Sequence, residues 1–562
     1  MEYIVFSGVI LAVILYIFIQ GKVNEKKQLE YFKQKLREQK GNAPEKEYKI
    51  ERFIRIPGYF EKHQEGFQID DITWNDLGMD DVFRRINYCV SSTGDEVLYH
   101  MLRTPALEKE KLEHFEDIVT YFSEHEEELI KYQCFMHKLG STGKYSIYDY
   151  LYYLERLDRH DNKREILSIL FFVAFIVLAC FQAGMGVACI LIWSLFQLKR
   201  YFKVKNSYEP YLTSLAYIMR MVDVGQEVSE ALPEVCAKEK EEIKQAAKQL
   251  KKAKKGSNWV FGSLYKTGSP EDVLFDYVRM FFHVDLIYFN HMLDELMLHK
   301  DQVDEMITAM GTVEAAGSVS RYRASLENGW CRPRFGEGKL QVENGYHPLL
   351  TNPVKNTIQT GKNVLLTGSN ASGKSTFLKT TALAALLAQT INTVTADEYQ
   401  APFYRLYSSM SLKDDLDSGD SYYIVEIKSI KRILDFAEVS KHKVLCFVDE
   451  VLRGTNTVER IAASSQILRK LTGENVLCFA ATHDIELTSL LENEYNNYHF
   501  EEDMEDGDIH FNYLLKPGKA TSRNAIRLLQ IIGYDQEIIE QANRQAVGFL
   551  ETGLWKMGEV RK

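Results

Sequence analysis

Residues 364–376 read VLLTGSNASGKST, and this stretch decides the fold of the C-terminal half of the chain. An apolar segment, Val364 to Leu366, is followed by the complete pattern G-x-x-x-x-G-K-[ST] of a phosphate-binding loop. Glycines let the backbone approach phosphate oxygens closely, and a helix that starts at the loop directs its positive end at the anion. The stretch therefore predicts a strand, a nucleotide-binding loop and a helix from Lys374 to about Gln389.

The loop offers several kinds of ligand to a nucleotide. Lys374 supplies a positive charge to the outer phosphates, and the Ser375 hydroxyl is a ligand for Mg²⁺, which prefers oxygen and keeps several of its waters. The other positions offer backbone N–H groups to the phosphates. The predicted ATP ligands of the loop are Gly368, Ser369, Asn370, Ala371, Ser372, Gly373, Lys374, Ser375 and Thr376.

Two further apolar runs end in polar residues, as buried parallel strands do when their carboxyl ends face a ligand. Residues 444–448 lead into Asp449 and Glu450, and residues 476–481 are followed, after one threonine, by His483. We expect Asp449 to hold Mg²⁺, Glu450 to orient and polarise the attacking water, and His483 to contact the terminal phosphate. Taken alone, each run is also compatible with a solvated strand end or a polar cap.

Together these motifs resemble the ATPase domain of the MutS family of DNA mismatch repair proteins, which belongs to the ABC-type ATPases. Four motifs correspond in the family's order, at residues 367–376, 414–426, 449–457 and 481–488. The segment Gly345-Tyr346-His347-Pro348 also matches. The resemblance covers the ATPase well, the helical core partly, and residues 1–70 not at all.

The resemblance implies a fold, a cofactor and an assembly. The fold is an α/β P-loop ATPase domain of the ABC type beside an all-α core and lever domain, and the ligands are ATP and Mg²⁺. In the family, the signature segment of one subunit caps the ATP of the other, which implies a homodimer in which Ser418, Gly419 and Ser421 act in trans. The chain departs from the family at three positions that usually hold Arg, Thr and Gly, and that here are Asp420, Tyr422 and Leu452. Because an acid beside a triphosphate is repelled, we expect no contact from Asp420.

The composition is that of a folded chain with several domains. It has 562 residues, 45% of them hydrophobic, and a net charge of -11. The negative charge argues against nucleic-acid contact over the whole surface, so any DNA contact must be local. The eight cysteines contain no C-x-x-C pair, and two of them lie inside predicted strands. This usage fits a reducing compartment and neither a disulfide framework nor a zinc site.

Two apolar stretches without charge predict membrane attachment. Tyr3 to Ile19 is followed by a basic segment, which is typical of an uncleaved anchor with the downstream chain in the cytoplasm; a buried helix is the alternative. Residues 166–198 have basic residues on both flanks, which favours a hairpin that turns near 182–186 over a soluble core helix. The length of this stretch does not by itself decide between one span and two, and both two short spans and a re-entrant hairpin remain open.

These features predict the order of segments along the chain. The order is a transmembrane anchor at 1–21, a basic juxtamembrane linker at 22–70, a helical core and lever domain at 71–165 and 199–315, a transmembrane hairpin inserted into it at 166–198, the ATPase domain at 316–546, and a C-terminal tail at 547–562.

Smaller elements follow from local composition. Strands are expected at 495–500 and 509–515, with the acidic run 501–508 as the turn between them, and a helix-turn-helix is expected at 521–546. No segment resembles the mismatch-reading domain of the family. Residues 122–124 match its Phe-x-Glu letters but lie in a helical stretch, where an ordinary helix face is expected.

One basic segment is a candidate for contact with a polyanion. Lys238 to Lys255 carries eight lysines against three glutamates in a helix-forming composition. Such a stripe neutralises phosphates without reading bases, and the binding that it gives depends on salt. A solvated helix surface and contact with anionic lipid are the two alternatives.

The sequence therefore predicts a membrane-anchored, MutS-like, Mg-dependent ATPase that works as a homodimer. Three function classes remain open. The first is a DNA-associated repair or damage-sensing ATPase, with DNA bound without sequence specificity through residues 238–255. The second is a membrane-bound mechanochemical ATPase or scaffold that does not read DNA. The third is a transporter, which we rank last because three short predicted spans make a poor translocation path.

Overall fold

The computed structural model describes residues 2–156, 162–261, 270–369, 372–410, 422–453, 455–505, 508–520, 525–553 and 555. Five predicted ligand positions lie outside the described residues: Asn370, Ala371, Ser418, Gly419 and Ser421.

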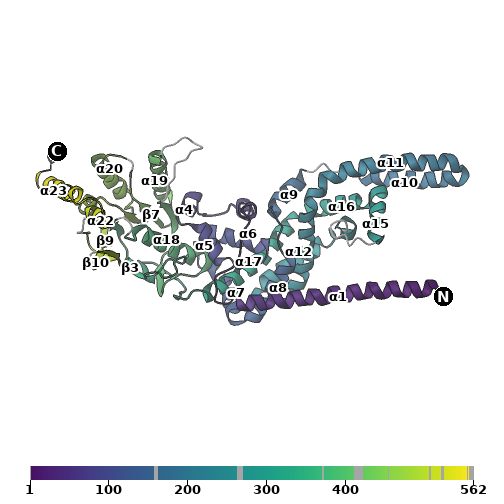
Figure 1. The fold of residues 1–562 in the computed structure, drawn as a ribbon, viewed down its shortest axis with the longest axis horizontal. Coiled ribbons are helices and arrows are strands. Elements are labelled where there is room, and N and C mark those ends of the chain that lie inside the picture. The colour runs from purple at the N-terminus through teal and green to yellow at the C-terminus, as the bar shows by residue number, and fades with distance from the viewer. Residues whose placement is uncertain are drawn as a thin grey trace. The chain divides into compact units, whose positions relative to one another are not determined.

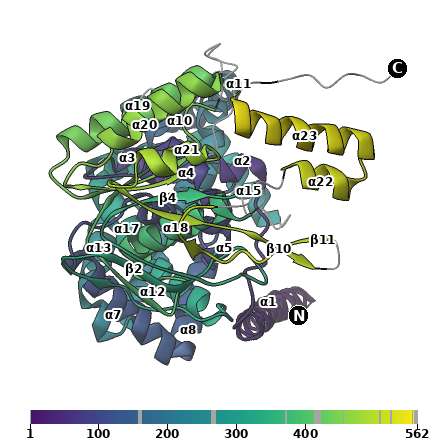
Figure 2. The same ribbon diagram turned by 90° about the vertical axis from the view of Figure 1, so that its left-hand side faces the viewer.

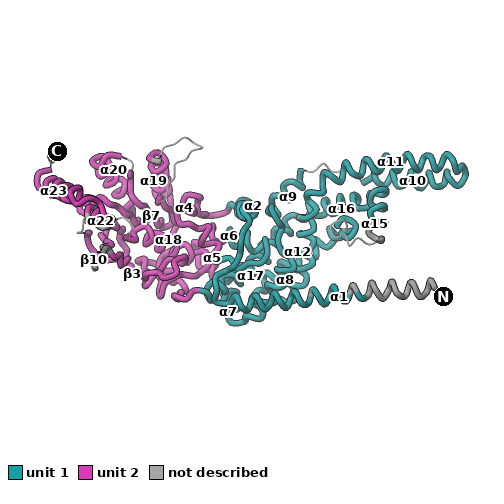
Figure 3. The backbone as a smooth tube through the Cα atoms, viewed as in Figure 1, with its two compact units in different colours: residues 1–64, 86–100, 114–325 teal, residues 65–85, 101–113, 326–562 magenta. Residues whose placement is uncertain are grey.

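The chain forms two compact units, shown in different colours in Figure 3. Unit 1 contains residues 1–64, 86–100 and 114–325, and unit 2 contains residues 65–85, 101–113 and 326–562. Figure 1 shows that unit 1 is built from helices and that the strands lie in unit 2.

The described helices of unit 1 vary widely in length. They are α1 (Glu2–Glu38), α2 (Ile50–Phe53), α3 (Gly58–Lys62), α6 (Ser92–Arg103), α7 (Glu110–Glu124), α8 (Glu126–Leu139), α9 (Ile147–Glu155), α10 (Asn162–Phe181), α11 (Ala183–Tyr208), α12 (Leu212–Ala231), α13 (Ala237–Leu250), α14 (Ser257–Phe261), α15 (Pro270–Phe282), α16 (Val284–Leu298) and α17 (Lys300–Ala324). The C-terminal residues of α6 and the N-terminal residues of α7 belong to unit 2. Residues 122–124 end α7, and Phe122 is buried, as expected for an ordinary helix.

The central helix of unit 1 is α17. It contacts α8, α12, α13 and α16, and its side chains are buried over most of its length. Small residues permit this close packing: a Cβ added at Gly311 would meet the Val97 side chain, and one added at Gly317 would meet Leu129. Burial on several sides explains why α17 shows no amphipathic stripe in its sequence.

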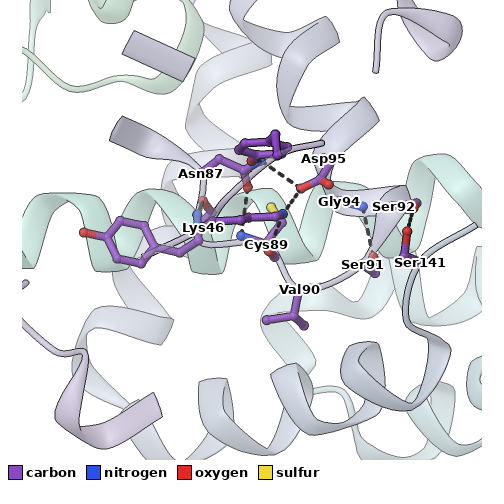
Figure 4. A network of polar contacts seen from close by, with 12 residues as sticks. Lys46, Asn87, Cys89, Val90, Ser91, Ser92, Gly94, Asp95 and Ser141 are labelled. Atoms are coloured by element: carbon purple, nitrogen blue, oxygen red, sulfur yellow. Dashed lines mark hydrogen bonds and ion pairs between the residues drawn. The ribbon is translucent and has the colours of Figure 1, made fainter. Parts of the chain in front are cut away.

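A buried polar network lies beside the first turn of α6 (Figure 4). Lys46 forms an ion pair with Asp95 and donates to the Cys89 carbonyl at 2.8 Å. The Asn87 amide donates to Asp95 at 2.8 Å. Because buried polar groups are unfavourable without partners, this network fixes the segment that contains Lys46 against α6.

The predicted apolar hairpin is a helical hairpin. Helices α10 and α11 contact each other and are joined at Gln182, where the turn was expected (Figure 1). Helix α11 continues to Tyr208, past the predicted end of the apolar stretch. Among the described residues, α10 has the length and hydropathy of a membrane span, with a mean hydropathy of 2.3.

Helix α1 is a single helix that passes the predicted boundary at residue 21. Its C-terminal part packs on α8, where Leu36 contacts Ile130 and Cys134. Arg37 pairs with Glu127 at 2.9 Å. The first part of the predicted linker is therefore helical.

Unit 2 is an α/β unit with three sheets. Its helices are α4 (Asp71–Asp76), α5 (Met79–Ile86), α18 (Lys374–Ile391), α19 (Tyr422–Val439), α20 (Thr457–Lys470), α21 (Ile485–Leu490), α22 (Ala525–Ile532) and α23 (Gln536–Thr552). Its strands are β1 (Arg334–Phe335), β2 (Leu340–Gly345), β3 (Asn356–Thr360), β4 (Asn363–Thr367), β5 (Glu398–Ala401), β6 (Arg405–Ser409), β7 (Val444–Asp449), β8 (Val476–Ala481), β9 (Tyr495–His499), β10 (Glu502–Glu505), β11 (Asp508–Phe511) and β12 (Lys516–Pro517).

The main sheet has the strand order β12-β9-β4-β8-β7-β6 and is parallel except for β12. Alternate residues of β7 and β8 pack against α19, α20 and α21 in one buried cluster, and these helices lie together in Figure 2. Helix α18 contacts β6, β7, β8 and also β2 of the four-stranded sheet β1-β5-β2-β3. Because β4, β7 and β8 are parallel, their carboxyl ends meet at one edge of the sheet.

The N-terminal segments of unit 2 are tied to β6 by a buried carboxylate. Asp76 accepts hydrogen bonds from the Ser408 hydroxyl at 2.7 Å and from the Met410 N–H at 2.9 Å. The Ser408 N–H donates to the Thr73 hydroxyl at 3.1 Å. Residues 65–85 and 101–113 thus pack within the ATPase-like unit, whereas the sequence-based division assigned 71–165 to the helical domain.

The sequence-based expectation for the acidic run 501–508 was wrong. Residues 502–505 form β10, which pairs antiparallel with β11, so most of the described residues of the run are strand residues. The strand expected at 509–515 ends at Phe511. Here backbone pairing overrides the low strand propensity of acidic residues. The helix-turn-helix at the C-terminus is present as α22 and α23.

Candidate nucleotide-binding site

The phosphate-loop sequence forms a tight connection between β4 and α18. Gly368 has φ 145° and Gly373 has φ 107°, values that favour glycine. A Cβ added at Gly368 would lie 2.7 Å from the Phe500 carbonyl oxygen, so a side chain is excluded there also by the close approach of the backbone. Strand β4 is buried along its whole length, and α18 begins at Lys374, directly after Gly373.

The ammonium of Lys374 lies over this loop. Its Nζ donates to the Gly368 carbonyl at 2.8 Å and to the Ser369 carbonyl at 2.7 Å. The Ser372 hydroxyl also donates to the Ser369 carbonyl, at 2.8 Å. A buried ammonium held at a helix N-terminus, where backbone N–H groups also point outward, makes this place strongly attractive to phosphate.

Ser375 and Asp449 meet across the sheet edge. The Ser375 side chain hydrogen-bonds to Asp449, and this contact lowers the pKa of the carboxyl, while burial, the larger effect, raises it. A hydroxyl and a carboxylate are hard oxygen donors of the kind that Mg²⁺ takes from a protein when phosphates and waters complete its shell. The donor set at this place therefore fits Mg²⁺.

Glu450 contacts a histidine and an arginine side chain. Its Oε1 lies 2.6 Å from His483 Nε2, and its Oε2 lies 2.8 Å from Arg453 Nε. The hydrogen bond from His483 is the main cause that lowers the pKa of Glu450, and the charges of Arg453 and Lys374 add to it. Glu450 is therefore ionised at neutral pH, as a group that accepts a proton from water must be.

His483 joins the acidic strand end to the phosphate loop. Its Nδ1 lies 3.1 Å from the Gly368 carbonyl oxygen, and its Nε2 faces the Glu450 carboxylate. His483 also follows β8, whose end is fixed by the Thr482 N–H donating to the Leu366 carbonyl at 2.9 Å.

The backbone after β7 is left-handed at two residues with side chains. Glu450 has φ 60° and Leu452 has φ 59°, a conformation that is uncommon outside glycine and asparagine. The left-handed backbone explains why a glycine suits position 452, and this chain accommodates a leucine there. Leu452 and Val451 are buried in the core between the sheet and α19, α20 and α21, and that packing holds the turn in place.

A cavity of about 570 Å³ opens in front of these groups. This volume is in the range of small-molecule sites, which is about 300–1,000 Å³. The predicted residues that line it are Ser369, Ser372, Gly373, Lys374, Ser375, Thr376, Glu450 and His483. The structure thus brings the described residues of the phosphate loop, Glu450 and His483 around one pocket. Asp449 is hydrogen-bonded to Ser375, and the Gly368 carbonyl is hydrogen-bonded to His483.

Sequence reasoning missed the wall of the pocket that faces the loop. His347, Asn356, Phe500 and Tyr513 line it. Burial lowers the pKa of His347 to about 4, so its ring is neutral at neutral pH. Asn356 donates to the Tyr513 carbonyl at 2.9 Å, which holds Tyr513 at φ 55°. His347 lies in the segment 345–348 that had been noted, whereas no local pattern marks Tyr513.

The C-terminal part of the chain is similar to known proteins. Residues 364–549 match the family model for MutS domain V. The chain is 34% identical over 223 residues to the DNA mismatch repair protein MutS of Thermus thermophilus, a match that covers 39% of this chain and 27% of the relative. It is 28% identical over 263 residues to the DNA mismatch repair protein MutS of Aquifex pyrophilus, covering 45% and 30% of the two chains.

A more distant relative gives the same picture. The chain is 27% identical over 279 residues to the DNA mismatch repair protein MutS 2 of Haloarcula marismortui, covering 44% of this chain and 29% of the relative. The chain thus spans less than a third of the length of each of these relatives. The similarity supports a MutS-type ATPase domain in the C-terminal part.

Proposed function

We propose that unit 2 binds ATP with Mg²⁺ and hydrolyses it to ADP and phosphate. The observation that carries this proposal is that Lys374, Ser375, Glu450 and His483 line one pocket, although they come from three different strand ends. The match of residues 364–549 to MutS domain V supports the same activity.

Each side chain has a role that its position supports. The loop N–H groups and Lys374 bind the phosphates, and Ser375 and Asp449 hold Mg²⁺, which neutralises phosphate charge when bound. Glu450 orients the attacking water and accepts its proton, which requires that a water replace one of the two side chains, His483 or Arg453, that contact the carboxylate. His483 then faces the terminal phosphate.

Replacement of one atom tests this assignment. In Glu450→Gln, the amide keeps the shape of the side chain but cannot accept a proton from water, so we expect ATP binding within about threefold of wild type and a loss of turnover on the order of 10²-fold or more. Isothermal titration and phosphate release measure the two quantities on the full chain in detergent. Turnover at the wild-type rate would remove Glu450 from the mechanism.

We further propose that two copies assemble with ATP between them, with Ser418, Gly419 and Ser421 of each copy reaching the ATP of the other. The match to MutS domain V extends through α22 and most of α23 and supports this assembly. Light scattering of the Glu450→Gln chain, after subtraction of the mass of bound detergent, should give twice the protomer mass when Mg·ATP is present. A protomer mass at saturating Mg·ATP would refute the dimer.

The third part of the proposal is attachment to a membrane through α1 and the hairpin of α10 and α11, with unit 2 and the rest of the helical unit in the cytoplasm. The hairpin of α10 and α11 supports it, because its apolar side chains are exposed: Leu170 is 59% exposed, Leu195 71% and Phe196 65%. Such a surface is unfavourable in water and favourable in hydrocarbon. The apolar part of α1 is the second candidate anchor, although most of its side chains lie outside the described residues.

Cys180 provides a test of the hairpin because it is exposed and lies two residues before the turn at Gln182. The full chain should sediment with membranes and resist carbonate extraction. A maleimide that does not cross membranes should label Cys180 in intact cells if α10 and α11 both span. Protection of Cys180 in chains that still resist extraction would favour the re-entrant hairpin, and extraction by carbonate would refute attachment.

The last part of the proposal concerns DNA. Helix α13 buries Ile243, Ala246 and Leu250 against its neighbours and exposes lysines on the other face. Lys244 and Lys248 lie on α13, and Lys252 lies just past its end. All three are exposed and follow one another at intervals of four residues, so they form a basic stripe that can neutralise phosphates without reading bases. We propose that this stripe binds duplex DNA without sequence specificity, in a protein related to mismatch repair ATPases.

Charge substitution distinguishes this proposal from its alternative, a membrane-bound ATPase that does not bind DNA. Replacing Lys244, Lys248 and Lys252 by Gln should weaken DNA binding and lower the slope of log K against log salt by about 3, since each phosphate contact contributes about 0.9. The matched control replaces Lys131 and Lys138, which are exposed on α8. Absence of salt-dependent binding in the wild type would favour the alternative.

A further inference from the structure

A buried carboxylate on α19 contacts the loop that carries Glu450. Glu426 is 3% exposed, and the Arg453 N–H lies 3.3 Å from its Oε1 and 3.2 Å from its Oε2. Burial raises the pKa of Glu426, and hydrogen bonds from the Arg453 and Leu452 N–H groups lower it. A carboxylate in the core thus has backbone N–H groups of the turn as partners.

The turn that Glu426 holds needs such support. Glu450 and Leu452 are both left-handed, and residues with side chains persist in that conformation only when surrounding contacts fix them. Three other contacts fix the turn: the Glu450 N–H donates to the Ala481 carbonyl at 2.9 Å, the Ser464 hydroxyl donates to the Val451 carbonyl at 3.1 Å, and Leu452 is buried. Glu426 supplies the partners for the two N–H groups that come next.

The position of the turn decides where the Glu450 carboxylate points. Arg453 Nε is 2.8 Å from Glu450 Oε2, so the residue whose N–H binds Glu426 also contacts the hydrolytic carboxylate through its side chain. A shift of the Leu452 and Arg453 backbone would therefore move Glu450 relative to His483 and the pocket. A displacement of about 1 Å at a reacting group is enough to lower a rate on the order of 10²-fold.

We propose that Glu426 is a positioning residue for ATP hydrolysis, which fixes the turn from Glu450 to Arg453 and links α19 to the hydrolytic carboxylate. This inference rests on the proposed ATPase function. Helix α19 is also the element that follows residues 411–421 along the chain, where the predicted trans contacts lie. Glu426 gives that helix a direct connection to the groups that act on water.

Two substitutions test the proposal. In Glu426→Gln, one acceptor oxygen remains and the NH₂ group cannot accept, so we expect kcat to fall about tenfold; in Glu426→Ala, with no acceptor, kcat should fall further. The Kd for Mg·ATP and KM should stay within about threefold, because no atom of Glu426 lines the pocket. The matched control is Glu438→Gln on the same helix, where the carboxylate is 69% exposed and pairs only at 4.0 Å with Lys470; its kcat should equal that of wild type.

Hydrogen exchange provides a readout that does not depend on turnover. The Leu452 and Arg453 amides should exchange about tenfold faster in Glu426→Gln than in wild type, and the amides of the buried strand β8 should be unchanged. Wild-type kcat in Glu426→Ala, or a loss of ATP affinity that parallels the loss of kcat, would overturn the proposal. If the wild type itself fails to hydrolyse ATP, the ATPase function fails, while unchanged exchange at Leu452 and Arg453 would refute the role of Glu426 by itself.

Discussion

Raising the pH from 5 to 8 should remove the contribution that the buried carboxyl group of Glu314 makes to the stability of unit 1. Glu314 on α17 is 2% exposed. Its Oε1 accepts the N–H groups of Val90 at 2.6 Å and Ser91 at 3.0 Å, and its Oε2 accepts the Ser91 hydroxyl at 2.5 Å. No cation is among these partners. Burial raises the pKa of Glu314 from 4.5 to about 7; the Asp95 charge adds to this, and the Lys46 charge opposes it.

The sign and size of the effect follow from proton linkage. Between pH 4.5 and 7, the folded state keeps a proton on Glu314 that the unfolded chain has released, so stability falls as the pH rises. The contribution is complete below pH 4.5 and is lost as the pH passes about 7. At about 1.36 kcal/mol per pH unit, the difference between 4.5 and about 7 corresponds to a loss of about 3 kcal/mol.

The assay compares wild type with Glu314→Gln, since the amide is neutral and does not titrate. Hydrogen exchange of the amides around α6 and α17 gives the free energy of opening at each pH. We expect the difference in opening free energy between the two proteins to change by about 3 kcal/mol from pH 5 to pH 8. Taking this difference cancels the titration of the other groups in the network of Figure 4, because both proteins contain them. A difference that is constant over this range would show that Glu314 titrates as it does in water and would refute the reasoning.

Three further predictions concern binding and packing. Lys374→Ala should weaken Mg·ATP binding by about 3 kcal/mol, a loss on the order of 10²-fold measured by titration, because it removes the charge over the loop. Arg52→Ala should destabilise unit 1 by about 3–5 kcal/mol in hydrogen exchange, since it leaves Glu96, 2% exposed and 3.0 Å from Arg52, without its cation; an effect below about 1 kcal/mol would contradict this. Gly94→Ala should cost about 1–3 kcal/mol in the same assay, because the added Cβ would overlap the Glu314 carboxyl group, and a neutral result would show that α17 moves aside.

Sequence reasoning located the loop side of the pocket, with Glu450 and His483, because these signals are local. Strands β4, β7 and β8 are short apolar runs that end in polar residues, and the glycines of the phosphate loop occupy positions where the backbone requires them. Parallel strands bring their carboxyl ends to one edge, so three local patterns far apart along the chain predicted one site.

Residues whose role depends on distant contacts gave no such signal. Glu314 binds Ser91, 223 residues away, and Asp76 binds Ser408, 332 residues away. Glu426 looks like any glutamate on a helix, and its partners are backbone N–H groups of another segment. The acidic run at 501–508 was misread because the pairing of β10 with β11 is a property of two strands together.

The sequence by itself determined the nucleotide-binding loop, the acidic and histidine strand ends, and the apolar hairpin of α10 and α11, because each is specified by residues close together along the chain. Only the tertiary structure decided which carboxylates are buried, which backbone groups they hold, and which side chains complete the pocket. The physical reason is that burial and hydrogen-bond partners depend on what the fold places within a few ångströms, and residues far apart along the chain supply those neighbours.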